Sequence, residues 1–264
     1  MPFRTQKISD PTYPADHLQF ITIKTARLQG RGDICVFVPP GESNTDLPLC
    51  ILLHGVYGSS WSWALNAGAH LTALNLMRVG KIRPMILAMP SDGLWGDGSG
   101  YLAHSGRDFE GWITEDVPTA VGEMIPQAAS STISFIHGLS MGGFGALRIG
   151  AKYPEKFQAI GGHSSITSLD QMKLFVEESL DVYTQMDSKD QDVFLWMQQN
   201  KDRLPPIRFD CGTDDLLISY NRQLHQNLLG AGILHEYEEF PGSHEWAYWA
   251  AHLGEMLIFF DQQY

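Results

Sequence analysis

A serine between two glycines is the most informative group of residues in this sequence. Residues 138–142 read Gly-Leu-Ser-Met-Gly, a match to Gly-x-Ser-x-Gly, and they follow the apolar run 133–136. Apolar residues at helical spacing come next, so the serine is expected at a tight turn between a strand and a helix. Such a turn exposes the hydroxyl, and the helix N-terminus behind it favours developing negative charge. We therefore predict that Ser140 is a nucleophile.

Two backbone N–H groups are needed to stabilise the oxyanion that forms when such a serine attacks a carbonyl carbon. In this kind of turn, one of them belongs to the residue after the nucleophile, here Met141. The other comes from a loop after an early strand, and the apolar run 49–53 followed by His-Gly fits that description. We place the second donor on Val56, with Tyr57 as the neighbouring alternative. Losing one such donor costs roughly 3–4 kcal/mol of transition-state stabilisation.

The general base is expected among the histidines after Ser140, because the chain order in such sites is serine, acid, histidine. His54 precedes the serine, and we expect it to orient its own loop through hydrogen bonds of the ring. His244 follows the last predicted strand in a loop, from which imidazole can reach over the sheet edge to the serine. It is the predicted base. The other histidines after Ser140 lie in helical patterns or beside predicted strands: His163, His225, His235 and His252.

The acid that orients the histidine is expected in the loop after the next-to-last strand, residues 207–211. Asp210 falls within that strand and is expected to be structural. Asp214 and Asp215 are adjacent in the loop, and spacing alone does not separate them. Either carboxylate has an alternative use as a turn residue or N-cap of the helix that follows.

The elements that would position these residues are apolar runs that alternate with helical patterns. Two opening strands followed by alternating strand and helix predict an α/β fold with a mostly parallel central sheet, an antiparallel start and helices on both faces. With the serine turn between strand and helix, this arrangement resembles the α/β-hydrolase fold. Strands are predicted at 19–24, 34–38, 49–53, 85–89, 133–136, 158–160, 207–211 and 236–240. Helices are predicted at 71–79, 113–125, 142–152, 219–229 and 245–259.

One long segment interrupts this alternation. Residues 169–204 carry helical patterns and no strand, which predicts a lid-like helical insertion within a single domain spanning 1–264. We expect it to cross the carboxyl ends of the strands, where α/β sheets bind ligands. Tyr57 and Trp95 are the predicted substrate contacts, because both lie in loops that follow strands. The alternative is that such aromatic residues only pack the loops and the insertion.

Composition narrows the classes of partner. A net charge of −12, without clusters of lysine and arginine, argues against nucleic acid and against anionic membranes. No apolar run approaches the roughly 20 residues of a membrane span, and residues 1–10 lack the apolar core of a secretory signal. Cys35, Cys50 and Cys211 form no metal-binding pair and are predicted to be free thiols. We expect a cytoplasmic protein without a metal or organic cofactor.

Five segments together resemble the putative-esterase family, which contains esterase D, S-formylglutathione hydrolase, feruloyl and tributyrin esterases and the antigen 85 acyltransferases. The family pattern Cys-Gly-x-x-Asp implies that Asp215 is the acid, and the family's oxyanion loop supports Val56. Leu139 at the turn and Asp-Cys-Gly before the acid look closer to the tributyrin and feruloyl branch. The matching segments are Leu-Leu-His-Gly (52–55), Met-Pro (89–90), Gly-Leu-Ser-Met-Gly-Gly-Phe-Gly-Ala-Leu (138–147), Cys-Gly-Thr-Asp-Asp (211–215) and Gly-Ser-His-Glu-Trp (242–246).

These observations predict a serine carboxylesterase that hydrolyses short-chain or aromatic acyl esters through an acyl-serine intermediate. Its partner would be a small-molecule ester, and assembly into a homo-oligomer is compatible with the sequence. Three alternatives stay open: an acyltransferase, a thioesterase similar to S-formylglutathione hydrolase, and a non-catalytic binding protein on the same scaffold.

Overall fold

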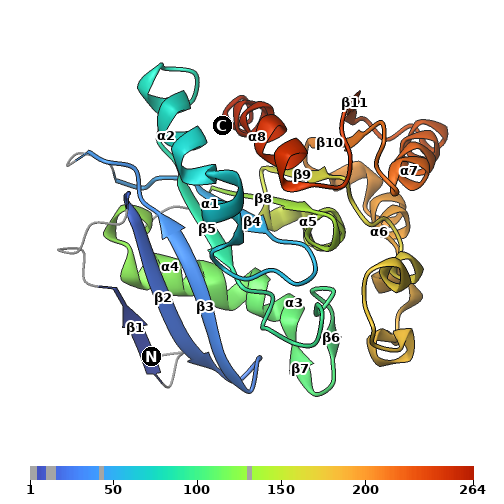
Figure 1. Ribbon diagram of the computed structural model, residues 1–264, viewed down its shortest axis with the longest axis horizontal. Helices are drawn as coiled ribbons and strands as arrows, with labels where there is room; N and C mark the ends of the chain where they lie inside the picture. The colour runs from blue at the N-terminus through green and yellow to red at the C-terminus, as the bar shows by residue number, and fades with distance from the viewer. Residues whose placement is uncertain (1–4, 10–15, 42–44, 130–132) are drawn as a thin grey trace.

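A nine-stranded sheet runs through the molecule (Figure 1). The computed structural model describes the chain except for residues 1–4, 10–15, 42–44 and 130–132, so the stretch 1–10, expected to lack a secretory signal, lies partly outside the described residues. The strand order is β1-β2-β3-β5-β4-β8-β9-β10-β11. The strands are β1 (Thr5–Ile8), β2 (Leu18–Thr25), β3 (Gly30–Phe37), β4 (Leu49–Leu53), β5 (Ile86–Pro90), β8 (Ser134–Leu139), β9 (Ala159–His163), β10 (Ile207–Gly212) and β11 (Glu236–Phe240).

The pairing of these strands confirms the predicted fold class. Strands β1, β2, β3 and β5 pair antiparallel with their neighbours in that order, whereas β5, β4, β8, β9, β10 and β11 are parallel to one another. Each of the eight predicted strands overlaps an observed one. The sequence did not indicate β1, because Thr-Gln-Lys-Ile is too short and too polar to give a periodic signal. A separate two-stranded ribbon joins β6 (Ala103–His104) and β7 (Arg107–Asp108).

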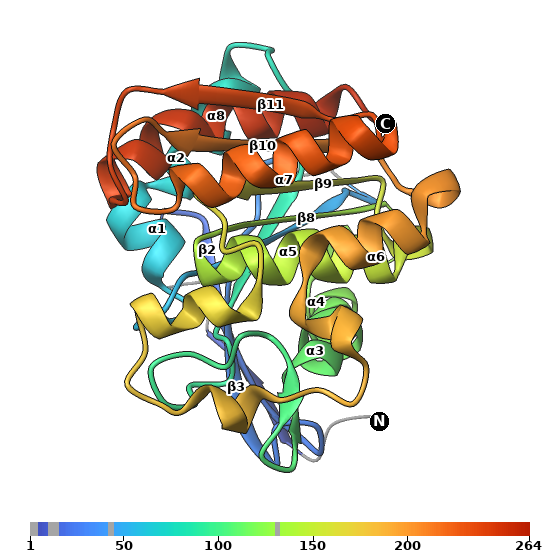
Figure 2. The ribbon, with the colours of Figure 1, turned by 90° about the vertical axis from the view of Figure 1, so that its right-hand side faces the viewer.

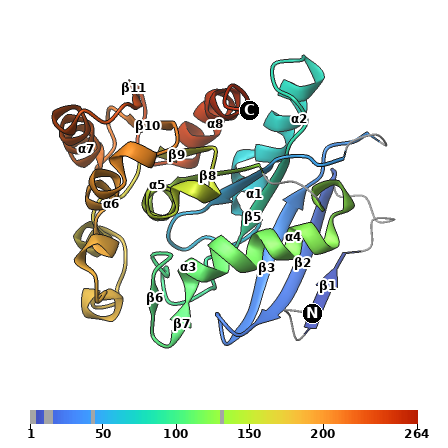
Figure 3. The ribbon, with the colours of Figure 1, turned by 180° about the vertical axis from the view of Figure 1, so that it is seen from behind.

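Helices cover both faces of the sheet, as predicted. In β4, side chains 49, 51 and 53 join one buried apolar cluster and side chains 50 and 52 join another, which explains the uninterrupted apolar run. Figure 3 shows α4 crossing in front of β2 and β3 on the first face. That face carries α3 (Phe109–Gly111), α4 (Val117–Met124), α5 (Met141–Lys152), α6 (Val193–Gln199) and α7 (Ile218–Ala231). The opposite face carries α1 (Ser62–Ala67), α2 (Ala69–Arg78) and α8 (Trp246–Asp261).

Segment 169–204 is less regular than its helical pattern suggested. It contains one α-helix, α6, and four short 3-10 helices, and an isolated bridge pairs Ser168 with Asp192 at its base. Figure 2 shows the segment in yellow to orange, with α6 beside α5. The 3-10 helices are Leu169–Leu174, Leu180–Tyr183, Ser188–Gln191 and Lys201–Arg203.

A buried ionic cluster ties this segment to the helix behind Ser140. Arg148 of α5 is fully buried, donates to the carboxylates of Glu110 and Asp190, and donates to the Tyr101 carbonyl oxygen at 2.7 Å. Lys152 donates to the same Asp190 at 2.7 Å. Burial acts to raise the pKa of Glu110, but Arg148 and Lys152 outweigh it and lower that pKa to about 2. The segment is therefore fixed to α5 at Asp190.

In the part of the chain that the structure describes, none of the helices combines the length and the apolar character needed to cross a membrane.

Candidate active site

Ser140 lies at the turn between β8 and α5, as its flanking glycines predicted. Its backbone has φ 54° and ψ −118°, and a positive φ of this kind is rare for a residue with a side chain. Both glycines are required by close approach of the backbone. An added Cβ would lie 2.1 Å from the Gly142 oxygen at Gly138, and 2.3 Å from the Leu53 oxygen at Gly142. The turn therefore closes only where both positions lack a side chain.

His244 contacts Ser140 from the loop between β11 and α8. Its Nε2 lies 2.9 Å from the Ser140 Oγ, and its Nδ1 lies 2.9 Å and 3.1 Å from the two carboxylate oxygens of Asp215. Because a carboxylate only accepts, Nδ1 carries the proton in this arrangement and Nε2 accepts from the serine hydroxyl. The structure thus joins the three predicted residues in a continuous chain of hydrogen bonds.

The structure also distinguishes the two adjacent carboxylates. The Asp215 side chain is buried, and its Oδ1 accepts the Leu217 N–H at 2.8 Å, which holds the carboxylate toward His244. Asp214 is exposed, and its backbone N–H donates to the Gly242 carbonyl oxygen at 2.9 Å. Only Asp215 is placed to orient the histidine.

The loop after β4 lies against Ser140, and both line the same cavity. A Cβ added at Gly55 would lie 3.3 Å from the Ser140 Cβ. The Tyr57 N–H donates to the Asp97 carbonyl oxygen at 2.8 Å, whereas within the described residues the Val56 N–H has no acceptor. Met141 is the first residue of α5, where backbone N–H groups have no partner within the helix. Val56 and Met141, rather than Tyr57, thus retain donors for a negative charge.

His54 holds this loop in place, as expected from its position before the serine. Its Nδ1 lies 2.6 Å from the Gly55 carbonyl oxygen, and its Nε2 accepts the Asp92 N–H at 3.1 Å. The Tyr101 hydroxyl donates to the His54 carbonyl oxygen at 3.0 Å. These bonds use both ring nitrogens in the neutral tautomer, so the ring braces the loop.

The remaining candidates lie away from the serine hydroxyl. His163 is buried at the end of β9, where its Nδ1 lies 2.7 Å from the Asp210 Oδ2. The Tyr248 hydroxyl donates to the other Asp210 oxygen at 2.8 Å, so Asp210 has the structural role expected of it. His225 and His235 contact each other, with 2.8 Å between ring nitrogens.

A cavity of about 370 Å³ opens beside the Ser140 hydroxyl. Tyr57 lines it, as predicted, but Trp95 does not. The Trp95 ring packs edge-on against His104 of β6 and Tyr183 of segment 169–204, with ring centroids 4.5 Å and 5.5 Å apart, so it packs its loop against these two elements. The lining residues are Gly55, Val56, Tyr57, Leu139, Ser140, Phe175, His244, Glu245, Trp246 and Trp249.

Sequence reasoning missed two of the aromatic residues in this cavity. Trp249 follows Trp246 by three positions in α8, a spacing that puts both on one helix face, and this signal was available. Phe175 lies at the end of a 3-10 helix in segment 169–204, where no periodicity marks it. Its ring stacks on the His244 ring with centroids 5.2 Å apart.

Among the described residues, no group of three or more His, Cys, Asp or Glu side chains could hold a metal ion. Cys35, Cys50 and Cys211 are free and buried, as predicted.

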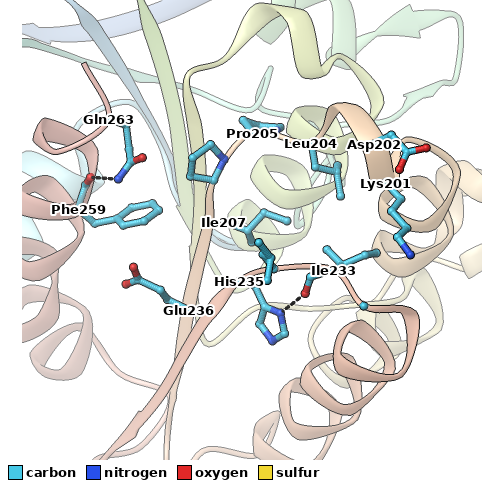
Figure 4. Close-up of a pocket in the computed structure, with 13 residues that line it drawn as sticks. Lys201, Asp202, Leu204, Pro205, Ile207, Ile233, His235, Glu236, Phe259 and Gln263 are labelled. Atoms are coloured by element: carbon cyan, nitrogen blue, oxygen red, sulfur yellow. Dashed lines mark hydrogen bonds between the residues drawn. The ribbon is translucent and has the colours of Figure 1, made fainter.

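A second cavity, of about 620 Å³, lies where β10 and β11 begin, at the opposite end of these strands from the loops that carry Asp215 and His244. Figure 4 shows the His235 ring hydrogen-bonded to the Ile233 carbonyl oxygen in this cavity, and Gln263 bonded to Phe259. None of the residues that line it forms a serine–histidine contact. The larger cavity therefore lacks the nucleophile that the smaller one has.

Known proteins resemble this chain in sequence. Residues 25–260 match the model of the family described as "Putative esterase". The chain is 29% identical over 222 residues to an acetyl esterase of Caldicellulosiruptor saccharolyticus, a match that covers 77% of this chain and 79% of that protein.

Two solved structures share the fold. A ferulic acid esterase superposes with a TM-score of 0.80 at 22% identity, over 98% of this chain and 99% of that one. An S-formylglutathione hydrolase from Agrobacterium tumefaciens superposes with a TM-score of 0.80 at 17% identity, over 100% of this chain and 99% of that one. The fold is that of the α/β-hydrolases.

Proposed function

The chain belongs to the putative esterase family, and from that premise we propose that it is a serine carboxylesterase with Ser140, His244 and Asp215 as its catalytic triad. One observation carries the proposal. His244 bridges the Ser140 hydroxyl and the buried Asp215 carboxylate, at 2.9 Å on each side. A nucleophile, a base and an orienting acid in this order can break an acyl bond.

The first half of the reaction follows from the position of each proton. Ser140 Oγ attacks the ester carbonyl carbon while His244 Nε2 takes the hydroxyl proton, and Asp215 stabilises the imidazolium. The Val56 and Met141 N–H groups would hold the oxyanion of the tetrahedral intermediate. When that intermediate collapses, the bond to the alcohol oxygen breaks, His244 protonates the leaving alcohol, and the acyl group stays on Ser140.

The second half repeats the same steps with water. His244 takes a proton from water, whose oxygen attacks the acyl-serine carbonyl carbon. The acid product leaves, and His244 returns the proton to the Ser140 oxygen.

Short-chain or aromatic acyl esters are the substrates that we infer. The cavity of about 370 Å³ lies near the lower end of the roughly 300–1,000 Å³ that small-molecule sites occupy. Its aromatic lining suits a flat or short apolar group, and one relative bears the name of an acetyl esterase. The three buried free cysteines support a reducing compartment such as the cytoplasm.

Acidic residues around Tyr57, which lines the cavity, argue against an anionic thioester such as a glutathione conjugate. Burial raises the pKa of the Tyr57 hydroxyl, and the negative charges of Asp97, Glu177 and Glu178 raise it further. Glu245 lines the cavity itself. A negatively charged substrate would be repelled here, and salt would weaken that repulsion.

Replacement of Ser140 tests the proposed function. Ser140→Ala should abolish turnover of p-nitrophenyl acetate and labelling by a fluorophosphonate, while circular dichroism stays that of the wild type. Ser243→Ala, whose side chain is exposed in the loop beside His244, should retain both. Adding an alcohol to the same assay separates hydrolase from acyltransferase, since only an acyltransferase would divert most product to a new ester. Turnover that survives in Ser140→Ala would refute the assignment.

A further inference from the structure

Phe175 is the one residue of segment 169–204 that reaches the catalytic cavity. Its ring stacks on the His244 ring, with centroids 5.2 Å apart and an angle of 30° between the planes. Trp249 packs edge-on against the same His244 ring, with centroids 5.0 Å apart and 88° between the planes. The imidazole thus contacts two aromatic rings, and one of them comes from a segment that carries none of the triad residues.

The backbone around Phe175 is bound to the loop that carries the proposed oxyanion donor. The Tyr57 hydroxyl donates to the Phe175 carbonyl oxygen. The Phe175 N–H in turn donates to the Met172 carbonyl oxygen at 2.9 Å, within its own 3-10 helix. The backbone of Phe175 is therefore hydrogen-bonded at both its N–H and its carbonyl group.

Asp97 completes this attachment from a third loop. Its carbonyl oxygen accepts the Tyr57 N–H at 2.8 Å, and its carboxylate accepts the Glu177 N–H at 2.8 Å. Its own N–H donates to the Glu178 carboxylate at 3.0 Å. Three loops that are distant in the sequence thus meet beside Phe175, so its ring is an ordered wall of the cavity.

The position of this wall has a consequence for substrate size. Phe175 is bulky, lies directly beside His244 and bounds a cavity of only about 370 Å³. We propose that Phe175 is a specificity-determining residue that restricts the site to esters with short acyl chains, and that Tyr57 and Asp97 hold it in that position. This inference rests on the proposed esterase function and specifies the substrate class for that same site.

A chain-length series tests the inference. For p-nitrophenyl acetate, butyrate and octanoate, Phe175→Ala should raise the octanoate-to-acetate ratio of kcat/KM about tenfold or more, because each added methylene in an apolar pocket changes kcat/KM by roughly that factor. Phe175→Leu should raise it less. Tyr57→Phe keeps the ring but loses the bond to the Phe175 oxygen, and should shift the ratio in the same direction.

The octanoate-to-acetate ratio of kcat/KM distinguishes an effect of Phe175 on pocket size from an effect on the position of His244. If the only effect of removing the Phe175 ring were to misplace the His244 imidazole, hydrolysis of all three esters would slow alike. The octanoate-to-acetate ratio would then stay unchanged. Leu174→Ala is the matched control, because Leu174 is the exposed neighbour of Phe175 and does not line the cavity. Its ratio should equal that of the wild type.

The outcomes distinguish this inference from the proposed function. A wild-type protein that turns over no ester would overturn the proposed function and this inference with it. Wild-type turnover with a ratio that changes by less than about twofold in both Phe175 variants would overturn the inference alone. Should Phe175→Ala fail to fold, as its melting temperature would reveal, Phe175→Leu decides in its place.

Discussion

At the scale of single residues, two neighbouring carboxylates have different surroundings. Asp215 is buried, and its carboxylate accepts hydrogen bonds from His244 Nδ1 and from the Leu217 N–H, whereas Asp214 is exposed. Spacing along the chain does not separate them, because both lie in the same turn after β10. The difference arises where this turn meets the loop that carries His244, and one residue of displacement changes the direction of the side chain.

This contrast predicts different effects for two conservative substitutions. Asp215→Asn should lower kcat for p-nitrophenyl acetate by about 10⁴, because an amide no longer stabilises the imidazolium or selects the productive tautomer. Asp214→Asn should stay within about twofold of the wild type, since an exposed group with no contact to His244 contributes little. Equal losses in both variants would argue against Asp215 as the acid.

At the scale of elements, the turn between β8 and α5 depends on backbone contacts that a side chain would prevent. At Gly142, the atom that an added Cβ would meet is a carbonyl oxygen of β4, which belongs to the centre of the sheet and cannot move aside cheaply. The turn, the end of β4 and the start of α5 are therefore one packed unit. The same unit carries Ser140 and the Met141 N–H.

Gly142→Ala should accordingly destabilise the protein by about 3 kcal/mol or more in urea unfolding, because overpacking against backbone cannot relax. Gly122→Ala is the matched control within α4, where an added Cβ meets nothing within 4 Å. That change should stabilise the protein by roughly 0.5–1 kcal/mol, since alanine favours helix over glycine. Comparable destabilisation by both would contradict the packing argument.

At the scale of the whole molecule, the sheet has buried histidines on both sides. Burial lowers the pKa values of His70, His104, His137 and His235. For His137 the decrease in pKa is large, because the ring is fully buried and a positive charge on it would also be repelled by His163. The folded protein therefore keeps this ring neutral where the unfolded chain would protonate it.

The sign of the pH effect follows from this difference. As pH falls below the unfolded value of 6.5, only the unfolded chain binds the proton, so stability decreases by up to about 1.4 kcal/mol per pH unit for His137. His137→Phe keeps an aromatic ring among Trp63 and Phe260 and removes the titrating group. Between pH 7.5 and 5.5 it should lose about 1 kcal/mol less unfolding free energy than the wild type in urea denaturation. An identical loss in the two proteins would refute the role of His137.

The sequence by itself determined the features that depend on local geometry. The turn at Ser140 could be predicted because close backbone approach demands glycine at fixed positions around it. Central strands such as β4 and β5 could be predicted because strands buried on both faces are continuous apolar runs. The place of His244, in the loop after the last of these strands, followed from chain order.

Only the tertiary structure decided which side chains from distant loops meet. It brings Asp215 rather than Asp214 to His244, puts Phe175 and Trp249 in the cavity, and packs Trp95 against His104 and Tyr183 instead. The Tyr57 N–H donates to the Asp97 carbonyl oxygen, whereas the Val56 N–H has no acceptor among the described residues. Each of these outcomes depends on contacts between segments tens of residues apart, and such contacts have no periodic signal along the chain.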